Sequence, residues 1–282
     1  MPDFDDPRLT LPSHTETLMQ VTAGVTALRK SPDPGAEMVS QALHGEQVLL
    51  HHEEGEFGLV QNLTDRYVGW ALMDALSAPA MPATHTVSAL RLYVYPVPSI
   101  KASPHYLISL GGRVVSEEQR EGRFLKCARA GWIYEDQLCP LDQYETDPAG
   151  IALKYLHAPY LWGGRESLGI DCSGLVQQAF GACGVSLPRD SDMQASWAGE
   201  AIENWQTPGA LRRGDLIFWP GHVGIMLDSE TLLHANAHHM CVAAEPLASS
   251  IARIEKQYGA PVGARRIDVL ANRGVTPPWR MV

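Results

Sequence analysis

Residues 169–180 read GIDCSGLVQQAF, a stretch in which an aspartate and a cysteine mark the point where a glycine-containing loop gives way to an apolar-striped helix. The start of a helix carries unpaired backbone N–H groups and the positive end of the peptide dipoles, and both favour negative charge. The pattern therefore predicts Asp171 as the helix cap and Cys172 as a nucleophile whose thiolate is stabilised by the helix start. The same N–H groups are suited to hold the oxyanion of an attacked carbonyl.

Two of the eleven histidines follow the pattern expected of a base that serves such a nucleophile. His222 follows the sequence FWPG and opens the apolar run HVGIML, and His234 lies in the next run, TLLHAN. If the two runs are antiparallel neighbours joined by a turn at residues 228–230, both imidazoles lie on one face of the sheet. We predict His222 as the general base for Cys172 and His234 as the group that fixes the tautomer of His222.

The composition excludes several other classes of protein. With a formal net charge of −10 and no Lys/Arg cluster, the 282-residue chain lacks the basic face of a nucleic-acid-binding protein. The pairs Arg212-Arg213 and Arg265-Arg266 are interpreted as solvated positions or salt-bridge partners. No stretch approaches the roughly 18 apolar residues of a membrane span, so we expect no membrane as a partner.

The cellular compartment is predicted from the N-terminus and the cysteines. The first twenty residues lack the positive start, the apolar run and the small-residue cleavage site of a secretory signal. Five cysteines are an odd number without a repeating spacing, so at least one thiol is unpaired within the monomer. Both observations predict a protein of the reducing cytoplasm.

The sequence pattern divides the chain into an N-terminal arm and three domains. Residues 1–17 are polar and proline-punctuated, and residues 18–80 contain short apolar runs separated by turn residues, as a small all-β domain does. Residues 83–140 follow a proline-rich linker and repeat this pattern. The pairs Gly69-Trp70 and Gly131-Trp132 are 62 residues apart, and an Ala-Leu-Arg segment precedes each of them, which indicates a duplicated module.

Residues 141–282 predict an α+β domain. Asp147 is expected to cap a helix with Pro148 at its first position, and the helix that begins near Cys172 is expected to end around 181–184. Strand-like runs follow at residues 214–219, 222–227, 231–236, 241–247 and 263–269. Helices followed by an antiparallel-looking sheet are typical of the α+β class.

Three segments of this last domain resemble a known family. DCSGLVQQAF, GDLIFW…GHVGIML and LLHAN occur in the order found in the NlpC family of papain-like cysteine peptidases, which cut peptidoglycan stem peptides. The resemblance covers roughly residues 145–270 and implies that Cys172, His222 and His234 hold the catalytic positions. The two upstream domains resemble bacterial SH3-like domains. The expected architecture is a papain-like catalytic domain, with helices packed on an antiparallel sheet, preceded by two small all-β SH3-like barrels.

Paired SH3-like domains together with this catalytic domain and no export signal resemble the dipeptidyl-peptidase branch of the family. That branch hydrolyses the bond between the γ-carboxyl of D-glutamate and a diamino acid in murein peptides that have a free N-terminal L-alanine. The resemblance implies the same reaction here, without a metal or another cofactor, and the missing signal implies recycling of cell-wall peptides. It leaves diaminopimelate and lysine both open as the diamino acid.

A substrate with a free amine implies a carboxylate in the site. In the segment LPRDSDMQ after the nucleophile helix, Asp190 is the first choice for this carboxylate and Ser191 for a hydrogen-bond donor to the substrate. Arg189 is expected either to meet the glutamyl carboxylate or to brace the loop. The neighbours of Cys172 at the helix start are also assigned to the substrate site: Asp171, Ser173 and Gly174.

Three further residues complete the expected substrate site. Trp162 in YLWGG resembles a wall of the family's cleft, although a core tryptophan beside Tyr155 fits the sequence equally well. In the resembled branch, a Glu and a Tyr of the first SH3-like domain bind the N-terminal amine, and the segments EMVSQALHGE and DRYVGW point to Glu37 and Tyr67. The alternatives are a surface charge at Glu37 and a packing role for Tyr67.

Other functions fit the sequence less well. His234, His238, His239 and Cys241 are close in sequence, but they lack the repeated Cys-x-x-Cys or helical histidine spacing of a zinc site. A non-catalytic module that binds cell-wall peptides is disfavoured, because all three catalytic-type positions are present. An amidase or acyltransferase on the same fold stays an alternative, since a fold does not determine its reaction.

Overall fold

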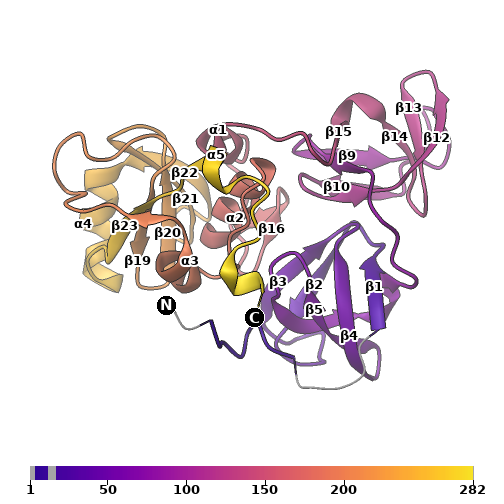
Figure 1. Cartoon of the computed structure of the whole chain (residues 1–282), viewed down its shortest axis with the longest axis horizontal. Helices are drawn as coiled ribbons and strands as arrows, with labels where there is room; N and C mark the ends of the chain where they lie inside the picture. The colour runs from indigo at the N-terminus through magenta and orange to yellow at the C-terminus, as the bar shows by residue number, and fades with distance from the viewer. Residues whose placement is uncertain (1–3, 12–16, 282) are drawn as a thin grey trace. The chain divides into compact units, whose positions relative to one another are not determined.

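The computed structural model describes residues 4–11 and 17–281, and these residues form two compact units (Figure 1). The N-terminal unit spans residues 5–143, and the C-terminal unit contains Phe4 and residues 144–281. Parts of the predicted arm, residues 1–3 and 12–16, lie outside the described residues. Phe4 packs on Trp197 of the C-terminal unit with ring centroids 5.2 Å apart, whereas the Arg8 carbonyl accepts a hydrogen bond from Val68 in the N-terminal unit. The arm is therefore shared between the two units.

The first half of the N-terminal unit is a seven-stranded antiparallel sheet in the order β3-β2-β6-β5-β4-β1-β7. Alternate residues of its strands point inward, and Leu28, Val48 and Val60 lie in a core from which water is excluded. Its elements are β1 (Thr17–Val21), β2 (Val25–Arg29), β3 (Met38–Leu43), β4 (Gln47–Glu54), β5 (Phe57–Asn62), β6 (Val68–Leu72), η1 (Met73–Ala75) and β7 (Leu76–Ser77).

The second half of this unit is built from three small sheets, in the orders β10-β9, β11-β8-β15 and β12-β13-β14. Leu92, Ile108, Leu125 and Ile133 lie in their common core. The elements are β8 (His85–Val87), β9 (Arg91–Val94), β10 (Tyr106–Ser109), β11 (Arg113–Val114), β12 (Ser116–Glu121), β13 (Phe124–Cys127), β14 (Gly131–Tyr134), η2 (Glu135–Gln137) and β15 (Leu138–Pro140).

The two Gly-Trp pairs occupy matching places in these halves. Trp70 of β6 pairs with Arg29 of β2, and Trp132 of β14 makes a bridge to Tyr95, directly after β9. The glycines allow this contact: a Cβ on Gly69 would lie 2.8 Å from the Cβ of Leu28, and one on Gly131 would lie 2.6 Å from the carbonyl oxygen of Tyr95. The repeated dipeptide thus marks the same close contact between two strands in both halves.

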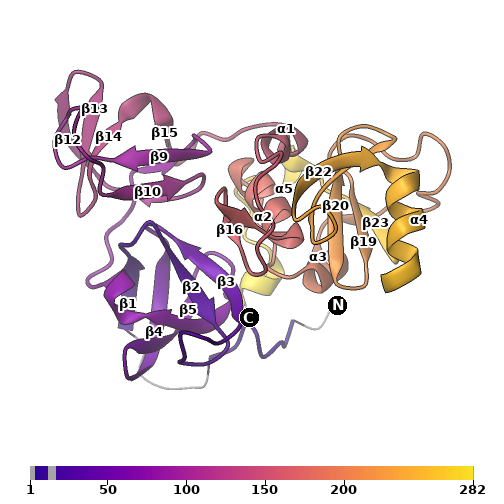
Figure 2. The same cartoon turned by 180° about the vertical axis from the view of Figure 1, so that it is seen from behind.

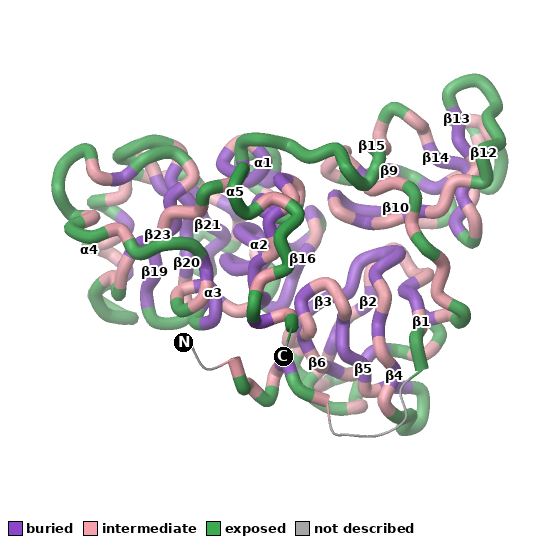
Figure 3. The backbone as a smooth tube through the Cα atoms, in the orientation of Figure 1, coloured by how far each residue is buried: buried purple, intermediate pink, exposed green. Residues whose placement is uncertain are grey.

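The C-terminal unit has helices on both sides of a six-stranded antiparallel sheet in the order β18-β23-β19-β20-β21-β22. The sheet lies between α2 and α4 (Figures 1 and 2), and α2 is buried from Cys172 to Phe180 (Figure 3). The helices are α1 (Pro148–Leu153), α2 (Cys172–Ala182), α3 (Ser191–Trp197), α4 (Leu247–Tyr258), α5 (Val269–Asn272) and η3 (Pro278–Arg280). The strands are β16 (Arg165–Glu166), β17 (Gly169–Ile170), β18 (Glu200–Ala201), β19 (Leu216–Trp219), β20 (His222–Met226), β21 (Thr231–Asn236), β22 (Cys241–Pro246) and β23 (Gly263–Arg266).

The α+β class and most of these elements were predicted, but three helices were not, among them the four-residue α5. The predicted cap at Asp147 and the start of α1 at Pro148 are confirmed, and so are salt bridges for Arg213 (to Asp147, 2.8 Å) and Arg266 (to Asp215, 2.6 Å). The short α3 and the longer α4 were missed. α4 follows Pro246 and has no side-chain cap, so the usual start signal is missing from its sequence. Among the described residues, no helix is long and apolar enough to cross a membrane.

The close contact at Gly69 predicts that one added methyl group lowers the stability of the protein. Gly69→Ala would place its Cβ against Leu28 in a filled core, and overpacking typically costs about 1–3 kcal/mol. We expect the free energy of unfolding, measured in urea, to fall by that amount. Gly35→Ala is the control, because its Cβ would meet only Asp33 Oδ1, at 3.4 Å. An unchanged stability of Gly69→Ala would contradict the contact between β2 and β6.

Candidate active site

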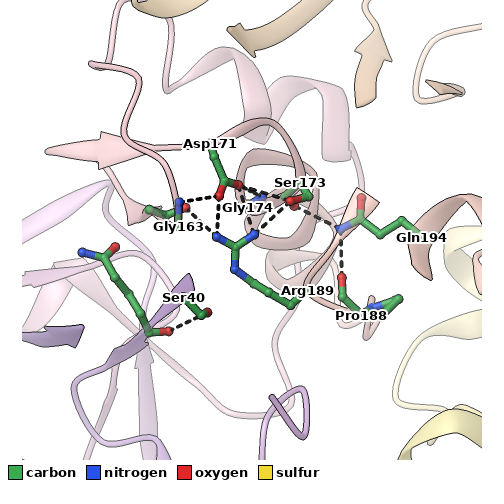
Figure 4. Close-up of polar contacts among 10 residues, drawn as sticks. Ser40, Gly163, Asp171, Ser173, Gly174, Pro188, Arg189 and Gln194 are labelled. Atoms are coloured by element: carbon green, nitrogen blue, oxygen red, sulfur yellow. Dashed lines mark hydrogen bonds and ion pairs between the residues drawn. The ribbon is translucent and has the colours of Figure 1, made fainter. Parts of the chain in front are cut away.

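The start of α2 is held by a buried ion pair between Asp171 and Arg189 (Figure 4). Asp171 occupies the N-cap position, and its Oδ1 accepts a hydrogen bond from the N–H of Gly174 at 2.7 Å. Nη1 of Arg189 donates to Oδ1 at 3.0 Å, and Nη2 donates to Oδ2 at 2.6 Å. The N–H of Gly163 donates to Oδ2 at 2.9 Å. Arg189 is only 1% exposed, so this pair is fixed by the surrounding protein rather than screened by water.

This network gives a structural role to four residues around the helix start. Arg189 also donates to the Ser173 hydroxyl at 2.9 Å, so its guanidinium is used inside the protein. Gly174 lies so close to the preceding loop that a Cβ would be 2.3 Å from the carbonyl oxygen of Gly164. The structure therefore shows a positioning role for Asp171, Ser173, Gly174 and Arg189. Their contacts with the substrate stay predictions. For Arg189 it supports the bracing alternative.

Cys172 is the first residue of α2 and is 7% exposed. Burial raises the pKa of its thiol to about 12, and the charge of Asp171 acts in the same direction. The backbone N–H of Val223, the Arg189 guanidinium and the N–H of Ser173 act against this rise. Burial therefore acts against the anionic sulfur expected from the helix start, and it outweighs the nearby donors. The hydrogen bond from Val223 places the sulfur beside the start of β20.

The predicted pair of histidines is present on β20 and β21. His222 opens β20 directly after Gly221, which has φ +71°, and Nε2 of His222 lies 2.8 Å from Nδ1 of His234. Gly224 is the reason that the two rings can meet on this face, since a Cβ there would lie 3.2 Å from the Cβ of His234. The ring of His222 also lies 5.7 Å from that of Trp219, across the hairpin.

The imidazole of His222 is neutral at neutral pH. Burial lowers the pKa of His222 to about 3, and the neighbouring His234 and Arg253 act in the same direction, while Glu245 opposes them. Since Nε2 is engaged by His234, Nδ1 is the nitrogen available to take a proton from a thiol. A neutral thiol and a neutral imidazole favour proton transfer during attack over a preformed ion pair.

Comparisons with known proteins support the same assignment. Residues 157–258 match the model of the NlpC/P60 family, and residues 28–76 match that of the bacterial dipeptidyl-peptidase Sh3 domain. The gamma-D-glutamyl-L-lysine dipeptidyl-peptidase of Bacillus subtilis (strain 168) is 36% identical over 221 residues, which cover 70% of this chain and 71% of that protein. The chain belongs to the NlpC/P60 family. It is a cysteine peptidase of that family with an N-terminal SH3 domain.

Two further proteins are similar to most of this chain. The dipeptidyl-peptidase 6 of Lysinibacillus sphaericus is 27% identical over 238 residues, which cover 77% of this chain and 86% of that protein. The crystal structure of an NlpC/P60 family protein from Bacillus cereus ATCC 10987 covers 89% of this chain and 99% of its own, with a TM-score of 0.74. At 19% identity, this last likeness shows the fold alone.

Two residues of this NlpC/P60 site were missed by sequence reasoning. Burial raises the pKa of the Tyr160 phenol, and the charges of Cys172 and Asp171 act in the same direction, so the hydroxyl keeps its proton. Glu245 on β22 accepts a hydrogen bond from Nε2 of His234 at 2.7 Å. Tyr160 belongs to the quoted segment YLWGG, and Glu245 to the predicted strand at 241–247, so both lay within recognised segments without a role.

The expected substrate residues of the C-terminal unit have different exposures. Trp162 is 59% exposed, which excludes the alternative of a core tryptophan. Asp190 is the half-buried N-cap residue of α3, and Ser191 is the first residue of that helix and is buried. These positions are compatible with contacts to a peptide, and such contacts stay predictions.

Glu37 and Tyr67 lie in the N-terminal unit. Glu37 is exposed and forms a salt bridge of 3.7 Å with Lys30, whereas Tyr67 is 5% exposed and directly precedes β6. Their expected contact with the substrate amine also stays a prediction.

The histidine-rich segment beside the site is engaged in hydrogen bonds of its own. Both ring nitrogens of His234 have partners, His222 and Glu245, and Nδ1 of His239 lies 3.0 Å from Oδ1 of Asn236. In the part of the chain that the structure describes, no three His, Cys, Asp or Glu residues are grouped to hold a metal ion.

The buried ion pair predicts a large effect of one substitution. Arg189→Met leaves the Asp171 carboxylate buried without its counter-ion, and breaking such a pair typically costs about 3–5 kcal/mol. We expect the free energy of unfolding of the C-terminal unit to fall by that amount in urea titrations. Arg213→Met is the matched control, because its partner Asp147 is half exposed and such pairs contribute about 1 kcal/mol or less. Equal losses in the two variants would contradict the role of Arg189.

The protonation states predict how Cys172 reacts with an alkylating agent. Because the thiol pKa is raised to about 12, the thiolate fraction grows about tenfold per pH unit across the neutral range. We expect the rate of iodoacetamide labelling of Cys172, followed by intact-mass spectrometry, to rise continuously from pH 6 to pH 9. A rate that is already constant at neutral pH would instead reveal a resting thiolate.

Proposed function

We propose that this enzyme hydrolyses the γ-D-glutamyl–diamino acid bond of murein stem peptides that carry a free N-terminal L-alanine. One observation carries most of the proposal. The similarity to the Bacillus subtilis gamma-D-glutamyl-L-lysine dipeptidyl-peptidase covers 70% of the chain, far more than the catalytic domain alone. A match of the SH3 region to a dipeptidyl-peptidase module supports the same branch of the family.

Cys172 is the proposed nucleophile and His222 the proposed base. As Sγ attacks the γ-carbonyl carbon, Nδ1 of His222 takes the thiol proton, and His234 keeps the imidazole in place through the bond to Nε2. The neutral resting state of both groups supports this order of events. A positioned base is typically worth about two to four orders of magnitude in rate.

The tetrahedral oxyanion faces donors at the start of α2 in this proposal. The backbone N–H of Cys172 lies at the positive end of the helix, and the Tyr160 hydroxyl is a second donor near the sulfur. His222 then protonates the amine of the departing diamino acid. Water, deprotonated by the same imidazole, hydrolyses the thioester, which releases L-alanyl-γ-D-glutamate and restores the Cys172 thiol.

The substrate contacts are proposed on chemical grounds. The exposed ring of Trp162 offers an apolar surface for the alanine side chain or the glutamyl methylenes. Asp190 supplies the negative charge that a free amine requires, and the amine contacts expected of Glu37 and Tyr67 stay predictions. Diaminopimelate and lysine are both kept as the diamino acid.

The proposed setting is recycling of cell-wall peptides in the cytoplasm. All five cysteines are free thiols: Cys127, Cys139, Cys172, Cys183 and Cys241. Free thiols, one of them catalytic, suit a reducing compartment.

The test compares four peptides: L-Ala-γ-D-Glu-diaminopimelate, its lysine counterpart, and the N-acetylated form of each. We expect mass spectrometry to find L-alanyl-γ-D-glutamate from the free peptides, with kcat/KM reduced about 10–100-fold by acetylation, because a charge-assisted hydrogen bond is lost. Equal cleavage of free and acetylated peptides would remove the amine site from the proposal.

Active-site variants distinguish a peptidase from a non-catalytic peptide-binding module and from an acyltransferase. Cys172→Ala is expected to bind the free peptide in calorimetry but to produce no dipeptide, and Cys241→Ala is the matched control that keeps full activity. Turnover by Cys172→Ala would contradict the role of the nucleophile. Transfer of the L-alanyl-γ-D-glutamyl group to an added amine, without hydrolysis, would indicate an acyltransferase instead.

A further inference from the structure

The histidine pair continues into two further charged residues on the same face of the sheet. Glu245 lies on β22, two residues beyond Ala243, the register partner of His234, and its Oε1 is 2.7 Å from Nε2 of His234. Arg253 of α4, which packs on this face, donates from Nη2 to the same oxygen. Glu245 is 15% exposed and Arg253 27% exposed, so the pair is largely shielded from water.

We propose that Glu245, held by Arg253, is a positioning residue that sets the tautomers of both histidines and leaves Nδ1 of His222 without a proton. The proposal rests on the proposed roles of Cys172 and His222. It adds a fourth and a fifth residue, from β22 and α4, to the arrangement that orients the base.

The tautomers follow from hydrogen-bond donors and acceptors taken in order. An ionised carboxylate only accepts, so Nε2 of His234 must carry the hydrogen of the bond to Glu245. In a neutral imidazole the other nitrogen is then an acceptor, so Nδ1 of His234 accepts from Nε2–H of His222. His222 is neutral as well, and its Nδ1 is left with a lone pair. A base that is to remove a thiol proton needs this lone pair.

The surrounding groups keep the Glu245 carboxylate ionised and the His234 imidazole neutral. The hydrogen bond from His234 holds the pKa of Glu245 down to about 2, so the carboxylate is ionised throughout the working range. Burial lowers the pKa of His234, and Arg253 and His239 act in the same direction, against the pull of Glu245. The groups that face His234 are thus His222 from β20, Glu245 from β22, Arg253 from α4 and His239 from the turn after β21. The positive charge of Arg253 opposes the effect of Glu245 on the pKa of His234. The carboxylate therefore orients His234 while the imidazole stays neutral.

Protonation of His234 would reverse the arrangement. A doubly protonated His234 donates from Nδ1, and Nε2 of His222 must then accept. The hydrogen of a neutral His222 would move to Nδ1, the nitrogen assigned to the thiol. The balance between Glu245 and Arg253 therefore decides whether the base is ready to act.

The first experiment reads the tautomers of the resting enzyme. Full-length protein labelled with 15N-histidine is expected to show, at pH 7, both His222 and His234 with hydrogen on Nε2 and a bare Nδ1; assignments come from single His→Gln variants. A hydrogen on Nδ1 of His222 would overturn the proposal. This readout needs no substrate, so it is independent of whether the proposed peptide is cleaved.

The second experiment distinguishes the role of Glu245 as a hydrogen-bond acceptor from the role of its negative charge. Glu245→Met removes both, and we expect kcat to fall about 10–100-fold with little change in KM, as for other residues that orient a catalytic group. Glu245→Gln keeps an acceptor oxygen and is expected to restore most of kcat. Glu255→Gln on the exposed face of α4 is the control that keeps full activity. Equal kcat values for wild type and Glu245→Met, with the fold verified by circular dichroism, would overturn the proposal.

The third readout is the acid limb of the pH profile of kcat/KM. Arg253→Met leaves the carboxylate uncompensated, so the pKa of the histidine pair rises and the acid limb moves to higher pH. Glu245→Gln should move it in the opposite direction. A purely structural role would lower activity without opposite shifts in the two variants, and identical profiles would count against the proposal. Activity remaining in Cys172→Ala would instead overturn the proposed function and leave the tautomer measurement standing.

Discussion

The active site depends on the buried pair of Asp171 and Arg189. Two charges removed from water are costly unless each is paired and hydrogen bonded, and here the carboxylate accepts from a guanidinium and from the N–H groups of Gly163 and Gly174. The pair joins the start of α2 to the segment before α3 and to the loop before β16. The position of Cys172, the residue next to Asp171, follows from this one interaction.

The chemistry of the site is a consequence of burial. Burial raises the pKa of the Cys172 thiol and lowers that of the His222 imidazole, which favours the neutral form of both groups. The hydrogen bond from Val223 N–H to the sulfur joins the helix start to the strand that carries His222. Hydrogen bonds connect His222 to His234 and His234 to Glu245, and Glu245 forms a salt bridge with Arg253.

Sequence patterns predicted elements where local signals are strong. The strands that carry His222 and His234 show apolar runs bounded by turn residues, and the start of α2 is given by its cap at Asp171. The repeated Gly-Trp pairs predicted two similar barrels because each glycine is required by the same close contact of two strands. α4 was missed because it begins after Pro246 without a capping side chain, and its helical form depends on packing against the sheet.

The sequence by itself indicated the proposed nucleophile, the pair of histidines and the α+β class, because these depend on neighbours along the chain or on one tight hairpin. Only the tertiary structure decided that Arg189 braces Asp171, that Glu245 bonds to His234, and that the thiol and the imidazole are neutral. Each of these depends on which side chains burial brings together across strands and helices. Protonation follows from the water that surrounds a group and the charges near it, and residue order does not encode either one directly.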